Sequence, residues 1–171
     1  TSKVVFATAP ALSGAGGIAG TPQVSVIAGA FGDDTANGGG SGFVTHGPTG
    51  VRLLTTTEYD STIVSGAATN ANVSLNAVVA GINSPTTINT LRLLNGGGVS
   101  GSSTLNISSG GVLIPTGANA SIAVDTISGN AIHLRNNGVV ALSSKVNAAT
   151  LNLSGDGVTT ASGALNVTGG I

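Results

Sequence analysis

The side chains that could do chemistry are few and widely spaced in this sequence. Six acidic and five basic residues occur among 171, with two histidines and no cysteine. A polysaccharide-cleaving site would need paired carboxylates, or a carboxylate beside a base, on one exposed face. Asp33-Asp34 is the only adjacent acid pair, and it lies in the glycine-rich loop 32–42. We therefore predict no catalytic residues, no enzymatic activity and no cofactor.

Asp33 and Asp34 are the one candidate metal site. Two carboxylates in a loop could reach one cation together with backbone carbonyls, the ligand set that Ca²⁺ prefers. The alternative is a turn held by hydrogen bonds between aspartate side chains and the backbone. The calcium-binding pattern Gly-Gly-x-Gly-x-Asp is absent from the sequence. We expect the turn, with Ca²⁺ as the alternative.

Glu58, Tyr59 and Asp60 form a second small cluster. They could contribute to a sugar site in which Tyr59 is a stacking platform, or they could be a solvated loop. A carbohydrate-binding or polysaccharide-cleaving protein would require these three residues to converge with Asp33 and Asp34 on one groove.

The charge pattern excludes some partners and favours others. Net charge is −1, and the charged residues occur singly, so there is no basic stripe for nucleic acid or for an anionic membrane surface. No apolar run is long enough to span a bilayer. His46 and His133 lack metalloprotease spacing, and His133 alternates with Ile132 and Leu134, which places it on an outward face. A surface rich in hydroxyls and amides with little charge favours self-association.

The elements that must position these residues are predicted to be strands. Short apolar and polar alternations are separated by Gly, Asn, Ser or Pro, and no long stretch keeps a helical apolar period. Strands are expected at 87–94, 103–107, 111–114, 121–124, 131–135, 139–142, 149–153 and 164–167. Residues 1–85 contain all the aromatic residues and are less regular. We predict an irregular Gly-rich β module there, capping or co-stacked with a solenoid at 86–171. The alternative is an insertion that packs against one face of the solenoid.

An internal repeat favours a parallel β-helix over an antiparallel sandwich. Leu105-Asn106-Ile107 recurs as Leu165-Asn166-Val167, and Thr90-Leu91-Arg92-Leu93 recurs as Thr150-Leu151-Asn152-Leu153. Both offsets are about 60 residues, which corresponds to about three coils of some 20 residues. Variable Gly-rich corners replace the two-residue hairpins that antiparallel pairing prefers. The predicted inward core ladder is Leu91, Leu93, Leu105, Ile107, Leu151, Leu153, Leu165 and Val167.

The strand–Gly-Gly–strand unit, as in Leu105-Asn106-Ile107-Ser108-Ser109-Gly110-Gly111-Val112-Leu113, resembles the autotransporter-associated β-strand repeats. These repeats occur in large secreted or surface-anchored bacterial proteins. The resemblance covers residues 86–171 and implies a right-handed parallel β-helix, exported and serving as a stalk, fibre or adhesin segment. It implies an extracellular or bacterial cell-surface location. The chain begins at Thr1 and stops within a repeat at Gly169-Gly170-Ile171, so we expect it to be part of a longer one.

We therefore predict a non-enzymatic extracellular structural module whose main partner is itself, end to end or side by side. It would bind no nucleic acid and insert no segment into a membrane. The alternative is a carbohydrate-binding or polysaccharide-cleaving β-helix at the cell surface, with glycans as partners.

Overall fold

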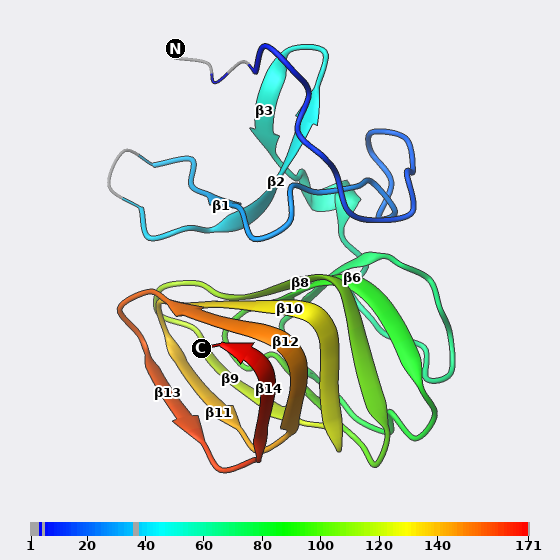
Figure 1. The fold of residues 1–171 in the computed structure, drawn as a ribbon, viewed down its shortest axis with the longest axis vertical. Coiled ribbons are helices and arrows are strands. Elements are labelled where there is room, and N and C mark those ends of the chain that lie inside the picture. Colours follow the sequence, from blue (N-terminus) through cyan, green and yellow to red (C-terminus); the bar gives the residue numbers. More distant parts are fainter. Residues whose placement is uncertain (1–3, 5, 36–37, 171) are drawn as a thin grey trace.

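The computed structural model describes residues 4, 6–35 and 38–170, and its regular secondary structure is β-strand apart from one short 3₁₀ helix. Figure 1 shows a stack of coils with a smaller N-terminal unit lying over one of its faces. In chain order the elements are β1 (Phe31–Gly32), β2 (Gly42–Gly47), β3 (Gly50–Leu53), the 3₁₀ helix η1 (Thr56–Glu58), β4 (Asn72–Leu75), β5 (Val78–Val79), β6 (Thr86–Leu93), β7 (Gly98–Ser100), β8 (Thr104–Ile114), β9 (Asn119–Ala123), β10 (Thr126–Asn136), β11 (Val139–Leu142), β12 (Lys145–Ser154), β13 (Val158–Ala161) and β14 (Leu165–Gly170).

The stack is a parallel β-solenoid of about five turns. One sheet has the strand order β14-β12-β10-β8-β6-β4, and the second has the order β13-β11-β9-β7-β5. Each strand therefore pairs with the strand one coil away, because the intervening strand belongs to the other sheet. This parallel pairing confirms the predicted solenoid and excludes the antiparallel sandwich for this part of the chain.

The register explains one of the two sequence repeats. Leu105 pairs with Ile127, Ile127 with Val146, and Val146 with Leu165. Leu165 thus lies three coils beyond Leu105 in the same ladder, and the 60-residue spacing corresponds to three coils.

The other repeat was misread. Leu91 pairs with Val112, Val112 with Leu134, and Leu134 with Leu153, so the partner of Leu91 three coils on is Leu153 and not Leu151. The offset in this ladder is 62 residues. The difference arises in β8, where the pairing with β6 shifts by two residues at an irregularity.

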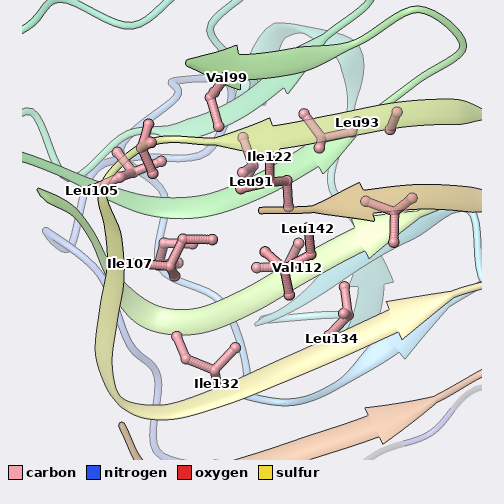
Figure 2. Close-up of a cluster of buried hydrophobic side chains, with 14 of the residues drawn as sticks. Leu91, Leu93, Val99, Leu105, Ile107, Val112, Ile122, Ile132, Leu134 and Leu142 are labelled. Atoms are coloured by element: carbon pink, nitrogen blue, oxygen red, sulfur yellow. The ribbon is translucent and has the colours of Figure 1, made fainter. Parts of the chain in front are cut away.

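Small aliphatic side chains fill the interior of the solenoid, as Figure 2 shows. Among the residues of the expected ladder, Leu91, Leu93, Leu105, Ile107 and Leu151 are buried. Leu153 and Leu165 require a correction, because they are 54 % and 42 % exposed, and Val167 is only partly buried. All three belong to the last coils, over which the described residues place no further layer.

The parallel sheets begin earlier than expected. β4 and β5 already pair with β6 and β7, so the solenoid includes residues that we had assigned to the N-terminal module. Asp60 forms a parallel bridge with Val73, and Ile63 joins the solenoid core. Parallel pairing with the solenoid therefore extends back to about residue 60.

The N-terminal module is built around the antiparallel sheet β1-β2-β3. A tight turn connects β2 and β3, with Gly47 opposite Gly50. Residues 23–28 take part in isolated bridges at Val24 and Val26. Within the described part of the chain, no helix has the length and apolar character needed to cross a membrane.

Candidate functional site

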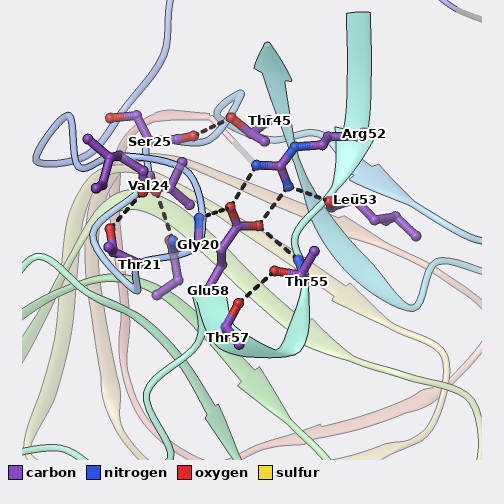
Figure 3. Close-up of polar contacts among 12 residues, drawn as sticks. Gly20, Thr21, Val24, Ser25, Thr45, Arg52, Leu53, Thr55, Thr57 and Glu58 are labelled. Atoms are coloured by element: carbon purple, nitrogen blue, oxygen red, sulfur yellow. Dashed lines mark hydrogen bonds and ion pairs between the residues drawn. The ribbon is translucent and has the colours of Figure 1, made fainter. Parts of the chain in front are cut away.

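Glu58, which we had considered for a sugar site, is fully buried at the end of η1 (Figure 3). Its Oε1 accepts hydrogen bonds from the Gly20 amide at 2.8 Å and from Arg52 Nη2 at 2.6 Å. Its Oε2 accepts bonds from Arg52 Nη1 at 2.7 Å and from the Thr55 amide at 2.8 Å. Two amides and a bidentate guanidinium thus satisfy this carboxylate.

These contacts fix the charge state of Glu58. The hydrogen bonds from Arg52, followed by those from the Gly20 and Thr55 amides, lower the pKa of Glu58 from 4.5 to about 2, although burial opposes the shift. The same pair raises the pKa of Arg52. A carboxylate held in this way is suited to joining η1, β3 and the loop at Gly20, and not to proton transfer near neutral pH.

Tyr59 is also committed to packing. Its ring lies under the Arg92 guanidinium, with Cζ 4.1 Å from the ring centroid, and its hydroxyl accepts a hydrogen bond from the Phe43 amide at 3.2 Å. Burial is the first cause of the raised pKa of Tyr59. The ring therefore joins the module to the solenoid and does not present an open face for sugar stacking. The carbohydrate alternative required Glu58, Tyr59 and Asp60 to converge with the loop aspartates on one groove, and neither groove lined by Asp33 includes any of the three.

Asp33 adopts the turn that we had set against a calcium site. Its Oδ1 accepts hydrogen bonds from the Thr35 amide at 2.9 Å and the Thr35 hydroxyl at 2.6 Å, and its Oδ2 accepts one from the Gly40 amide at 3.0 Å. The Thr35 hydroxyl is the first cause of the lowered pKa of Asp33. Asp34 is exposed beside it. The described residues include no group of three or more His, Asp or Glu side chains placed to hold a metal ion.

The outer face of the six-stranded sheet holds the module through a row of residues that the sequence analysis did not single out. Arg92, Leu113 and Arg135 follow one another in this row on β6, β8 and β10. Arg92 Nη1 donates to the Ser41 carbonyl at 3.2 Å, and Arg135 Nε donates to the Gly39 carbonyl. Leu113 is completely buried with Phe43 in a second apolar cluster. Each arginine follows an inward leucine in the sequence, so strand alternation could have predicted that it points outward. No neighbouring residue in the sequence indicates that the N-terminal module covers it.

Two buried asparagines make a further connection. Asn72 Nδ2 donates to the Val24 carbonyl at 2.8 Å, and Asn72 Oδ1 accepts from Asn89 Nδ2 at 2.8 Å and from the Thr90 hydroxyl at 3.2 Å. Both asparagines are completely buried, and burying their amide groups without hydrogen-bond partners would destabilise the fold. These bonds supply the partners. They tie the N-terminal loops to β4 and β6.

A groove of about 500 Å³ lies between residues 29–33 and 38–40 on one side and the outer faces of β10 and β12 on the other. His133 lies there, outward as expected, and its Nδ1 is 3.1 Å from Asn152 Nδ2. His46 lies elsewhere, in the module, with its ring centroid 6.0 Å from that of Phe6. Of the acids singled out from the sequence, only Asp33 lines this groove.

Comparisons of the chain with protein-family models, with curated proteins and with solved structures found no match.

Proposed function

We propose that this chain is a non-enzymatic structural module, a β-solenoid that associates with copies of itself through the exposed side chains of its last coils. The observation that carries the proposal is the state of the last coils. Leu153 and Leu165 continue inward ladders whose earlier members are almost fully buried, yet both are largely exposed. Among the described residues β14 is the last strand of its sheet, so its outer backbone groups have no strand partner there.

The other end of the stack is different. The segment after η1 crosses it, with the Asp60–Val73 bridge and Ile63 against the core. The Asn72 amide also donates to the Pro22 carbonyl at 2.7 Å. We propose that copies of this 171-residue segment pair through the exposed side chains of its last coils, in a two-fold arrangement.

The arrangement of the ionisable groups supports a structural role. The negative charge of Glu58 is balanced by Arg52, and Asp125 Oδ1 lies 3.1 Å from Lys145 Nζ. Asp33 holds a turn. A location outside the cell or at a bacterial surface is part of the proposal. It is supported by the resemblance to the autotransporter-associated repeats and by the polar, weakly charged composition. We propose no nucleic-acid partner and no membrane insertion for this segment.

Sedimentation of the 171-residue chain over a range of concentrations tests the association. We expect a concentration-dependent dimer of twice 16.2 kDa. Leu165→Lys, which places a charge on the open inner face, should abolish it. The matched control is Asn166→Lys, which alters the neighbouring exposed residue on the outward face and should leave the dimer intact. A monomer at all concentrations, or equal loss in both variants, would contradict the proposal.

A further inference from the structure

Another pocket, of about 310 Å³, lies in the N-terminal module between the loop 12–25 and the hairpin formed by β2 and β3. All of its lining residues fall within 12–25 and 45–52, segments that the structure describes throughout, and none belongs to the solenoid. Its volume is at the lower end of the roughly 300–1,000 Å³ of ligand sites. The pocket is therefore of a size for a small molecule.

Arg52 offers this pocket one edge of its guanidinium group. The edge formed by Nη1 and Nη2 is filled, because both atoms donate to Glu58 and Nη1 also donates to the Leu53 carbonyl at 2.9 Å. A guanidinium has five N–H groups in a fixed planar fork, so the Nε–H and the second Nη2–H remain side by side. No described residue accepts a hydrogen bond from either of them. In Figure 3, Thr45 lies on the side of the guanidinium away from Glu58, and both Thr45 and Arg52 line the pocket.

Two buried hydroxyl groups complete the polar side of the pocket. The Thr45 hydroxyl donates to the Ser25 carbonyl at 2.7 Å, which leaves the lone pairs of Thr45 Oγ1 to accept. Ser25 Oγ accepts from the Gly16 amide at 3.0 Å, which leaves its own O–H to donate. Both residues are buried and line the pocket. An acceptor is therefore placed among donors, an arrangement that fits a ligand group able both to accept and to donate.

The charge balance argues against an anionic ligand. Arg52 already forms an ion pair with the fully buried Glu58, at 2.6 Å. A ligand carboxylate would compete with Glu58 for the same cation, and it has no proton to donate to Thr45 Oγ1. A primary amide avoids both costs, because its carbonyl can accept from the free guanidinium edge while its N–H donates to Thr45.

Apolar side chains line the rest of the pocket and set the remainder of the ligand. They come from Leu12, Ala19, Val24 and Pro48. Such a wall, within this volume, suits a short aliphatic chain. We propose that this pocket binds a small uncharged amide with a short aliphatic chain. The site goes beyond the structural role and does not depend on the last coils of the solenoid.

Nuclear magnetic resonance of the full chain tests the proposal. Primary amides with short branched chains would be titrated into the isotope-labelled protein, each beside the carboxylate that has the same chain. We expect the amide ligands to cause saturable shifts of the backbone amides of Gly16, Ser25 and Thr45. The matched carboxylate should bind about tenfold more weakly, because it leaves Thr45 without a donor and competes with Glu58.

Filling the pocket gives a matched pair of variants. Ala19→Trp changes an exposed lining residue and should weaken binding by about tenfold or more. The control is Ile18→Trp, at the neighbouring position, which is 78 % exposed and does not line the pocket, and it should bind as the unaltered chain does.

The backbone shifts of β2 and β3 in both variants would show that the module stays folded. Binding lost in Ala19→Trp and kept in both Ile18→Trp and Leu165→Lys would support a pocket site separate from the association surface. Three outcomes would overturn the proposal: no saturable shift with any amide, carboxylates bound as tightly as their matched amides, or equal binding by the two tryptophan variants.

Discussion

The solenoid and the N-terminal module bury their interiors by different means. In the solenoid, Leu, Ile and Val recur in ladders, and each side chain contacts the same kind of side chain in the coils above and below. The module uses contacts that occur once, such as the tilted Phe31–Phe43 pair with centroids 5.4 Å apart and the Arg52–Glu58 ion pair. The solenoid thus builds its core from repeated aliphatic contacts in place of large aromatic side chains, whereas the irregular module needs a few strong, specific contacts.

The two regions meet through a third kind of contact. Arginines that point outward from the regular sheet bind backbone carbonyls and an aromatic ring of the irregular module. The solenoid therefore provides a rigid face, and the conformation of the module depends on its contacts with that face. If this division is correct, changes in each region should have separable effects. The single tyrosine, with no tryptophan present, allows fluorescence to report on the module while circular dichroism reports mainly on the solenoid.

The largest effect is expected from Leu151→Asp. Leu151 is 2 % exposed and pairs with Ile132, so the variant buries an unpaired charge at a cost of several kcal/mol. Protection of the backbone amides against hydrogen exchange should be lost first in β10 and β12, and less in the module. Asn152→Asp, one residue on and exposed, is the control and should retain protection. Equal loss in both variants would mean that alternation does not govern these strands.

A smaller effect, confined to the module, is expected from Glu58→Gln. Breaking one partner of a buried ion pair costs about 3 kcal/mol, at the low end of the usual range because the Arg52 side chain is 33 % exposed. Denaturation followed by tyrosine fluorescence should shift to lower denaturant, while the dichroism transition moves less. The control is Lys145→Ala, which removes an exposed ion pair of the solenoid and should leave both transitions in place.

The same carboxylate predicts a pH dependence. The pKa of Glu58 is about 2 when folded against 4.5 for the unperturbed group. Its contribution is therefore fully present above pH 4.5 and is lost as pH falls toward 2. Module stability should fall over this window in the unaltered chain and fall less in Glu58→Gln. Asp33, whose pKa is also lowered, leaves a residual slope in the same direction. Identical profiles would show that the ion pair contributes nothing.

The smallest effect is expected at the junction. Arg92→Met keeps an apolar stem but removes the cation over Tyr59, and such contacts contribute about 1 kcal/mol. Tyrosine emission should change and exchange should rise in β2, while β8 and β10 stay protected. Arg92→Lys retains the charge but loses the planar guanidinium. Its changes in tyrosine emission and in β2 exchange should therefore lie between those of the unaltered chain and those of Arg92→Met. Loosening of β8 to the same extent as β2 would argue against a rigid face.

The sequence alone determined the main architecture. Period-two alternation, glycine-rich corners and a 60-residue repeat are properties of neighbouring residues and of chain length, and they sufficed to predict a parallel solenoid. They also placed His133 outward and Leu151 inward, because successive side chains of a strand point to opposite faces.

Only the tertiary structure decided the rest. The two-residue shift between β6 and β8 changes which residues are stacked, so similarity between 90–93 and 150–153 did not mean equivalence. The burial of Glu58, the covering of Tyr59 by Arg92, and the groove shared by Asp33, His133 and Asn152 all join segments far apart in the chain. Such contacts depend on how an irregular module is placed on a regular face. No local pattern specifies that placement, because the contacts that fix it occur once and do not repeat.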